Sequence, residues 1–292
     1  MSGTSRSRLR RLRAAIPATG CVVALFWAAQ ATAAVTVGQL PTSPQPASDS
    51  CPSNRDYLQP SVTGGILYIA RQAGTIISWS TNVSGAGGQS YAFKVFRRTS
   101  DPDVFQVVGQ DVEHPLTPGL NTFPANVDVE SGDMIGLHVD GGPQNSCVFP
   151  MPGDALLQSQ SPGDLALGQS AQFVPVTERR LNLSAVLVPS NAFTITGISR
   201  NRRSGTARLS AALSNPGLVT IGGRGLKGRQ ATRAVAGAVS LKISATGKRG
   251  RKLSRTGRLR VPVTVTFYPT GGDPAIQTIA VKLIKRRRPP LL

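Results

Sequence analysis

The sequence predicts an all-β protein with two β-sandwich domains behind a signal peptide. Valine, threonine, serine, glycine and proline are plentiful, and apolar residues alternate with polar ones along many short segments. Alternation with a period of two is typical of half-buried strands, and no long stretch shows the 3.6-residue period of an amphipathic helix. A sharp change of charge near residue 190 indicates two domains. We therefore expect a signal peptide at residues 1–33, a flexible lead-in at 34–60, a jelly-roll-like sandwich at 61–190 and a basic sandwich at 191–292.

The first 33 residues have the composition of an export signal. An apolar stretch at residues 14–29 ends at Ala31-Thr32-Ala33, which suits cleavage before Ala34. The segment before it has no acidic residue and contains five arginines: Arg6, Arg8, Arg10, Arg11 and Arg13. The pair Arg10-Arg11 also fits a twin-arginine signal, so the export route stays open. We expect a secreted protein, released or associated with the cell envelope.

Two cysteines, Cys51 and Cys147, remain after the predicted cleavage. In an oxidising compartment they most simply form a disulfide with each other. Two buried free thiols are the alternative.

The first sandwich is predicted from strand patterns separated by turns rich in Gly, Asp and Asn. In one strand Tyr91, Phe93 and Val95 alternate with other residues, and the segment at 181–188 alternates in the same way. Further strands are expected at residues 66–70, 75–83, 105–108, 127–129, 134–139 and 148–149. The less regular stretch at residues 151–172 is expected to be a long loop.

The second sandwich shows clearer alternation, at residues 207–213, 239–243, 259–267 and 279–283. With residues 194–198 and 218–221 these segments give six or seven strands in about a hundred residues, which matches an immunoglobulin-like or fibronectin-III-like sandwich. Pro262 cannot donate a ladder hydrogen bond, so its strand is expected at a sheet edge or with a bulge.

Several segments resemble those of secreted actinobacterial proteins that place a basic immunoglobulin-like module behind varied extracellular domains. The resemblance lies in residues 205–209, 217–225, 251–257 and 263–274 of the second domain. Residues 74–80 and 131–137 are similar to an uncharacterised partner domain of such modules. The resemblance implies an architecture and a location. It brings no catalytic residues.

Charge divides the chain. Residues 35–190 hold 7 Lys and Arg against 13 Asp and Glu, whereas residues 191–292 hold 21 against 1. Such a density of positive charge attracts polyanions. The candidate polyanion-binding residues are Lys248, Arg249, Arg251, Lys252, Arg255, Arg258, Arg260, Lys285, Arg286, Arg287 and Arg288, the first four of them in an expected turn.

Anionic wall polymers or lipid head groups are the expected partners of an exported bacterial protein. Export and the scarcity of aromatic side chains for base stacking argue against nucleic acid. The alternative is that these cations only solvate short hairpins. The sequence does not indicate an oligomeric state.

Catalytic chemistry has little support in the sequence. The two histidines, His114 and His138, lie in no recognisable triad, and no Gly-x-Ser-x-Gly or phosphate-binding loop occurs. Asp133, His138 and Asp140 lie close in sequence, but Asp is a common turn residue, and we expect neither a metal nor a cofactor.

Trp79 and Tyr91 are candidates for a carbohydrate platform, yet their strand parity favours the core. We therefore expect a non-catalytic binding protein of the cell surface. The alternatives are a secreted hydrolase or carbohydrate-binding protein acting through the first sandwich, and a structural spacer.

Overall fold

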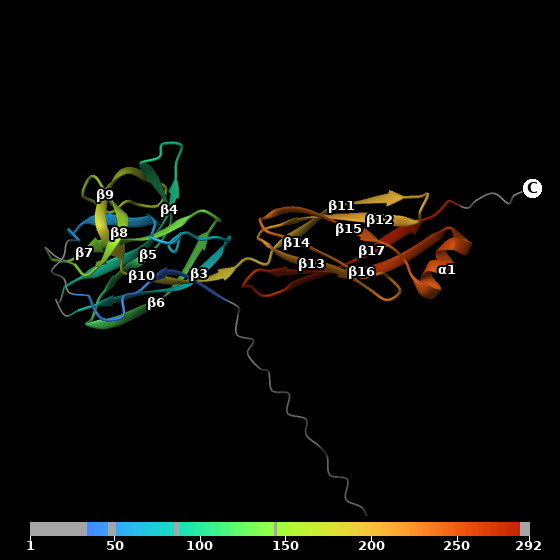
Figure 1. Ribbon diagram of the computed structural model, residues 1–292, viewed down its shortest axis with the longest axis horizontal. Coiled ribbons are helices and arrows are strands. Elements are labelled where there is room, and N and C mark those ends of the chain that lie inside the picture. Colours follow the sequence, from blue (N-terminus) through green and yellow to red (C-terminus); the bar gives the residue numbers. More distant parts are fainter. Residues whose placement is uncertain (1–33, 46–50, 85–87, 143–144, 287–292) are drawn as a thin grey trace, which may run out of the picture. The chain divides into compact units, whose positions relative to one another are not determined.

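The computed structural model describes residues 34–45, 51–84, 88–142 and 145–286, and nearly all of its regular structure is β. The predicted all-β fold is therefore confirmed (Figure 1). The signal-peptide prediction at residues 1–33 lies outside the described residues. The described residues include no helix with the length and apolar character that a membrane span requires.

A four-stranded antiparallel sheet forms one layer of the N-terminal part. Its strands, in sheet order, are β1 (Val35–Gln39), β10 (Leu183–Pro189), β3 (Gly74–Val83) and β6 (Gly119–Val129). The alternation of Leu183, Ala185 and Leu187 points these side chains into the core, as the sequence predicts.

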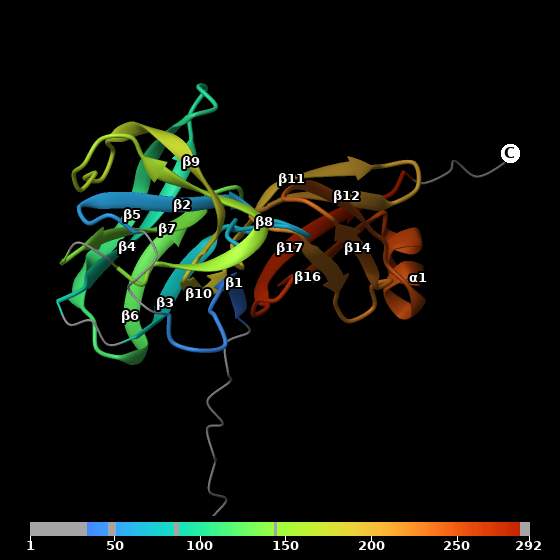
Figure 2. The ribbon, with the colours of Figure 1, turned by 60° about the vertical axis from the view of Figure 1, so that its left-hand side comes forward.

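Six further strands close into a barrel (Figure 2). Their order around the barrel is β2 (Arg55–Ser61), β7 (Met134–Asp140), β4 (Ser90–Arg98), β5 (Val104–Pro115), β9 (Ser170–Leu181) and β8 (Val148–Ser159). The sequence did not indicate this closure. Residues 151–172, expected as a long loop, instead form most of β8 and the start of β9, joined by a loop at residues 160–169.

The wall strand β4 is buried on both faces, because one face packs on the four-stranded sheet and the other lines the barrel. Tyr91, Phe93 and Val95 join the larger core with Trp79, whereas Phe96 belongs to a smaller core inside the barrel. This smaller core consists of Leu58, Phe96, Phe105, Val107, Met134 and Phe173. A strand with two buried faces can carry apolar residues on both of them, which explains why Ala92 and Phe96 are apolar as well as Tyr91, Phe93 and Val95.

The expected flexible lead-in at residues 34–60 is wrong for the two strands within it. Val35–Gln39 pairs with β10, and Arg55–Ser61 pairs with β7 and β8. Cys51, just before β2, forms the predicted disulfide with Cys147, and both residues are fully buried. The short strand β1 escaped prediction because its few apolar residues precede a run rich in Pro, Ser and Gln.

The strands between Phe193 and Ile284 form a second sandwich with a separate hydrophobic core. One sheet contains β11 (Phe193–Asn201), β12 (Thr206–Leu213) and β15 (Gly237–Ile243). The other contains β14 (Arg229–Arg233), β13 (Gly217–Gly222), β16 (Arg258–Pro269) and β17 (Ala275–Ile284). A single helix, α1 (Gly247–Thr256), joins β15 to β16. This order of strands fits the predicted immunoglobulin-like sandwich.

Pro262 does not mark an edge strand, since β16 lies between β13 and β17. Pairing with β13 covers only Thr264 to Pro269, and Pro262 lies beyond its end. The missing N–H of the proline therefore costs no hydrogen bond to β13.

Candidate functional site

The predicted basic segment at Lys248 to Lys252 forms part of helix α1 and not a turn. The sequence conceals the helix because ten residues hold a single buried apolar side chain, Leu253. The helix ends at Gly257, whose φ of 70° suits glycine and whose N–H donates to the carbonyl of Leu253. Leu253 faces the core of the second sandwich, and four cations of the helix face solvent: Lys248, Arg251, Lys252 and Arg255. Arg249 is half-buried.

The other predicted cations continue this surface. Arg258 and Arg260 point outward from β16 because Leu259 and Val261 point inward. Lys285 follows β17 and donates to the Ser254 hydroxyl of α1. The exposed residue Arg286 comes next, while Arg287 and Arg288 lie outside the described residues.

The turn between β11 and β12 lies at the same end of the sandwich as α1 (Figure 1). Residues of this turn line a hollow of about 720 Å³. The backbone N–H of Arg286 donates to the carbonyl of Arg202, which joins the chain after β17 to this turn. Six cationic residues line the hollow: Arg200, Arg202, Arg203, Arg208, Lys242 and Arg286. Of these, only Arg286 is among the polyanion-binding residues predicted from the sequence. The run Arg200-Asn201-Arg202-Arg203, which lies between the expected strands at residues 194–198 and 207–213, was the signal that could have located the hollow.

The cations of the second sandwich lack carboxylate partners. Among the described residues, every ion pair lies in the N-terminal part, and no Lys or Arg after residue 190 takes part in one. Like charges even face each other across strands. Arg208 is the register partner of Lys242, and Arg260 is the register partner of Lys282. Such pairs are destabilising unless an anion lies between them.

The trio Asp133, His138 and Asp140 does not form one site. Asp133 accepts two hydrogen bonds from the Arg97 guanidinium, at 2.7 and 2.9 Å. Asp140 accepts hydrogen bonds from the Ser53 hydroxyl and the Gly141 N–H, which lower the pKa of its carboxyl group. His138 is buried, and its Nδ1 lies 3.1 Å from Oδ1 of Asp56.

The aromatic candidates are core residues, as their strand parity predicts. Trp79 and Tyr91 are fully buried, and so is Tyr68. The indole Nε1 of Trp79 donates to Asp111 at 3.0 Å, and His114 lies 3.1 Å from the same carboxylate oxygen. Neither Trp79 nor Tyr91 offers a flat exposed face for a sugar ring.

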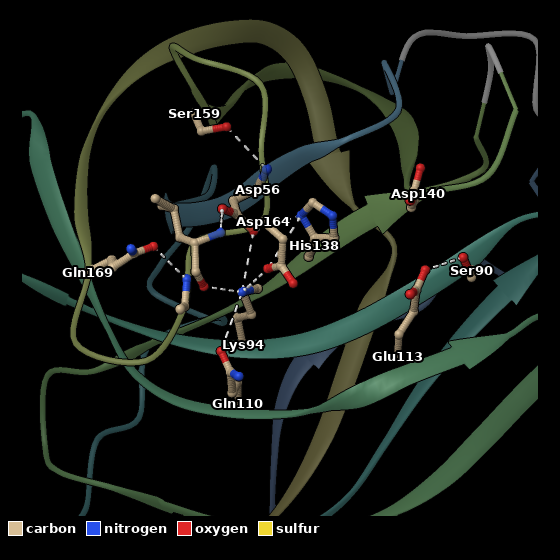
Figure 3. Close-up of polar contacts among 12 residues, drawn as sticks. Asp56, Ser90, Lys94, Gln110, Glu113, His138, Asp140, Ser159, Asp164 and Gln169 are labelled. Carbon is tan, nitrogen blue, oxygen red and sulfur yellow. Dashed lines mark hydrogen bonds and ion pairs between the residues drawn. The ribbon is translucent and has the colours of Figure 1, made fainter.

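A cluster of charged side chains that the sequence did not reveal lies inside the barrel (Figure 3). Asp56 of β2 and His138 of β7 are register partners, and His138 Nδ1 lies 3.1 Å from Asp56 Oδ1. Lys94 of β4 is 1 % exposed, and its Nζ lies 3.8 Å from Asp56 Oδ1. Asp164, from the loop between β8 and β9, places Oδ1 against Lys94 Nζ and 3.9 Å from His138 Nδ1.

The cluster binds the loop at residues 160–169 to strands β2 and β4. Asp56 Oδ2 accepts the Leu165 N–H at 3.1 Å, and Lys94 Nζ donates to the Leu165 carbonyl. The sequence did not reveal Lys94, because it lies on the face of the strand opposite to Tyr91, Phe93 and Val95, which form the predicted core face. That pattern predicts a solvated lysine, and only barrel closure buries it.

Known protein families give no further assignment. No family model matches this chain, and no curated protein matches its sequence significantly. The resemblance to secreted two-domain proteins therefore stays a prediction.

Proposed function

We propose that this protein is a non-catalytic, exported binding protein whose basic second sandwich associates with anionic cell-wall polymers. The observation that carries the proposal is the set of unpaired cations around α1 and the arginine-lined hollow. A surface with one sign of charge and no internal counter-ions attracts a polyanion at long range and gains contacts when it binds.

The like-charge strand pairs strengthen this proposal. Arg208 and Lys242 both line the hollow, directly opposite each other on β12 and β15. Phosphate or carboxylate groups of a polymer at this position would offset the repulsion between the two side chains, and arginine favours such groups because it can donate two parallel hydrogen bonds.

Nucleic acid fits this surface less well. The aromatic residues of the second sandwich are Phe193, Phe267 and Tyr268, and the two phenylalanines are buried. Tyr268 alone is exposed, at 44 %. A single ring provides no stacking platform for successive bases. The predicted export signal also separates the chain from cytoplasmic nucleic acid.

Sedimentation with purified cell walls tests the proposal. The mature protein should co-sediment at low ionic strength and elute as salt rises toward about 1 M, where the screening length falls to about 3 Å. Vesicles with and without anionic lipid, run in parallel, separate wall polymers from lipid head groups. Equal binding to walls at low and high salt contradicts the proposal, and binding to anionic vesicles alone contradicts the assignment to wall polymers.

Charge-reversal variants locate the binding surface. Reversal of Arg202 and Arg208 to Glu, or of Arg251, Arg255, Arg258 and Arg260 to Glu, should weaken wall binding. Arg71→Glu combined with Arg98→Glu is a matched control for the first pair, because it makes the same change of net charge on exposed side chains of the first domain. An equal loss with this control would show that location does not matter, contrary to the proposal.

A further inference from the structure

The ammonium group of Lys94 is buried and has two carboxylate neighbours, unlike a lysine in an ordinary surface ion pair. Its side chain enters the barrel on the same face as Phe96 and is almost fully buried. Its Nζ touches Asp164 Oδ1, and Asp56, whose carboxylate is fully buried, lies 3.8 Å away (Figure 3). Gln110 Oε1 lies 3.5 Å from the same nitrogen. A buried ammonium group is stable only when such partners compensate for the loss of water.

These groups are the ones that amide formation requires: an amine, a carboxyl group in contact with it, and a second carboxylate that can accept and return protons. We propose that Lys94 and Asp164 form an intramolecular isopeptide bond between Nζ and Cγ. The bond would fasten the loop at residues 160–169 covalently to β4.

The reaction balances without any other reactant. The Lys94 ammonium first gives one proton to the Asp56 carboxylate. Asp56 then passes this proton to the Asp164 carboxylate, so that a neutral amine meets a neutral carboxylic acid. The Nζ lone pair then attacks Cγ, a C–N bond forms, and the bond from Cγ to one oxygen breaks. That oxygen leaves as water with two protons from the original ammonium. The third proton remains on the amide, and no oxidation or reduction occurs.

His138 acts as a positioning residue in this scheme. It lies 3.1 Å from Asp56 Oδ1 and 3.9 Å from Asp164 Oδ1, so it neighbours both the proton acceptor and the reacting carboxyl group. A hydrogen bond from Nδ1 orients the Asp56 carboxylate, and the Leu165 N–H holds its second oxygen. The Asp164 side chain is 58 % exposed, so the released water has a direct route to solvent.

The folded structure favours the bond because it fixes both partners. Correctly oriented groups within one molecule react as if present at about 10⁵–10⁸ M, which overcomes the dilution that opposes amide formation in water. The product also removes the positive charge of the buried Lys94 side chain, which removes a desolvation cost.

A metal ion is the rival interpretation of this cluster, since ligand atoms of Asp56, His138 and Asp164 lie within 4.8 Å of one another. Lys94 argues against it. Its ammonium group already occupies the position of a cation between the two carboxylates, and it would repel a second one.

Mass spectrometry of the intact mature protein, with the disulfide reduced, tests the proposal. We expect a mass lower than that of the sequence by one water molecule, and a tryptic digest in which the peptides containing Lys94 and Asp164 are joined. A wild-type mass equal to the sequence mass would overturn the proposal and leave an ion pair.

Two substitutions check the chemistry. Asp164→Ala should restore the full mass, because the acceptor carboxyl group is gone. Asp56→Asn should also restore it in protein that remains folded by Trp79 fluorescence, because the proton acceptor is lost. Asp103→Asn is the control: this exposed carboxylate lies in the turn between β4 and β5, and the variant should still lose water. Loss of water in Asp164→Ala would contradict the assignment of the acceptor.

Discussion

The Nε atom of Arg180 on β9 lies 2.5 Å from Oδ2 of Asp154 on β8, and Asp154 is fully buried. Asp154 also accepts the Thr63 N–H at 2.6 Å, and Arg180 donates to the Gln39 side chain at 2.6 Å. This pair therefore ties β1, the barrel and the segment after β2 together. Burial by itself would raise the pKa of Asp154, but the hydrogen bonds from Arg180 and Thr63 outweigh it and lower the pKa.

The stability of the N-terminal part should consequently depend on pH. A carboxyl group with a lowered pKa in the folded state contributes stability above its unfolded pKa, and this contribution is lost as the pH falls through the folded value. The free energy of unfolding should fall on acidification below about pH 4, near the ordinary pKa of Asp.

Asp154→Asn should flatten this dependence and lower the free energy of unfolding at pH 7 by about 3–5 kcal/mol, since it leaves Arg180 unpaired. Urea unfolding at several pH values measures both effects. Asp128→Asn, at an exposed carboxylate of β6, should leave the pH dependence nearly unchanged. An unaltered pH profile in Asp154→Asn would contradict the prediction.

The disulfide between Cys51 and Cys147 closes a long loop, with 96 residues of sequence separation. Restricting the unfolded chain in this way stabilises the fold by about 4–5 kcal/mol in the chain-entropy model. We expect the double variant Cys51→Ser, Cys147→Ser to have a free energy of unfolding lower by about 4–5 kcal/mol, and therefore to unfold at a lower urea concentration. Wild-type protein with added reductant should unfold at the same midpoint as the variant. A variant as stable as the oxidised protein would contradict the prediction.

The two sandwiches should unfold independently, because their buried residues form separate cores. Trp79 is the one tryptophan that follows the predicted cleavage site, so its fluorescence reports on the first sandwich alone. Phe267 is fully buried in the second core, and Phe267→Ala should destabilise that core by about 3–5 kcal/mol.

Circular dichroism should then show an earlier transition while the Trp79 fluorescence transition stays in place. Phe267→Leu is the milder control and should shift the first transition less. An equal shift in both signals would indicate a single cooperative unit, contrary to the prediction.

Gly136 on β7 should tolerate no side chain. A Cβ atom there would lie 2.2 Å from the Tyr57 carbonyl oxygen and 2.7 Å from the Phe96 ring. We expect Gly136→Ala to destabilise the barrel by about 1–3 kcal/mol or more, as overpacked cores do. At Gly197 on β11 a Cβ atom meets nothing within 4 Å, so Gly197→Ala should cost far less. Equal thermal midpoints for the two variants would contradict the prediction.

The sequence predicted the features that depend on local pattern. Alternation placed Trp79 and Tyr91 in the core, predicted most strands, and separated two charge regions. The expected oxidising compartment predicted a disulfide between Cys51 and Cys147, which the structure confirms. These predictions were possible because strand parity and cysteine number are local or compositional properties.

The features that depend on closure were missed. The barrel forms because β8 and β9 pair with strands from elsewhere in the chain, and no local pattern encodes that pairing. Barrel closure in turn buries Lys94, which alternation alone assigns to solvent. Helix α1 was missed because its exposed face is entirely polar and its contact with the core depends on Leu253 alone.

Positive charge on the edge strand β14 also affects how copies of this protein can associate. An edge strand has unpaired backbone groups that can act as a template for a strand of another molecule. Arg229 and Arg233, at the two ends of β14, are both exposed. When two copies approach along this edge, their arginines repel before backbone hydrogen bonds can form. Charge that attracts a polymer can thereby also protect a crowded population of the protein from aggregation.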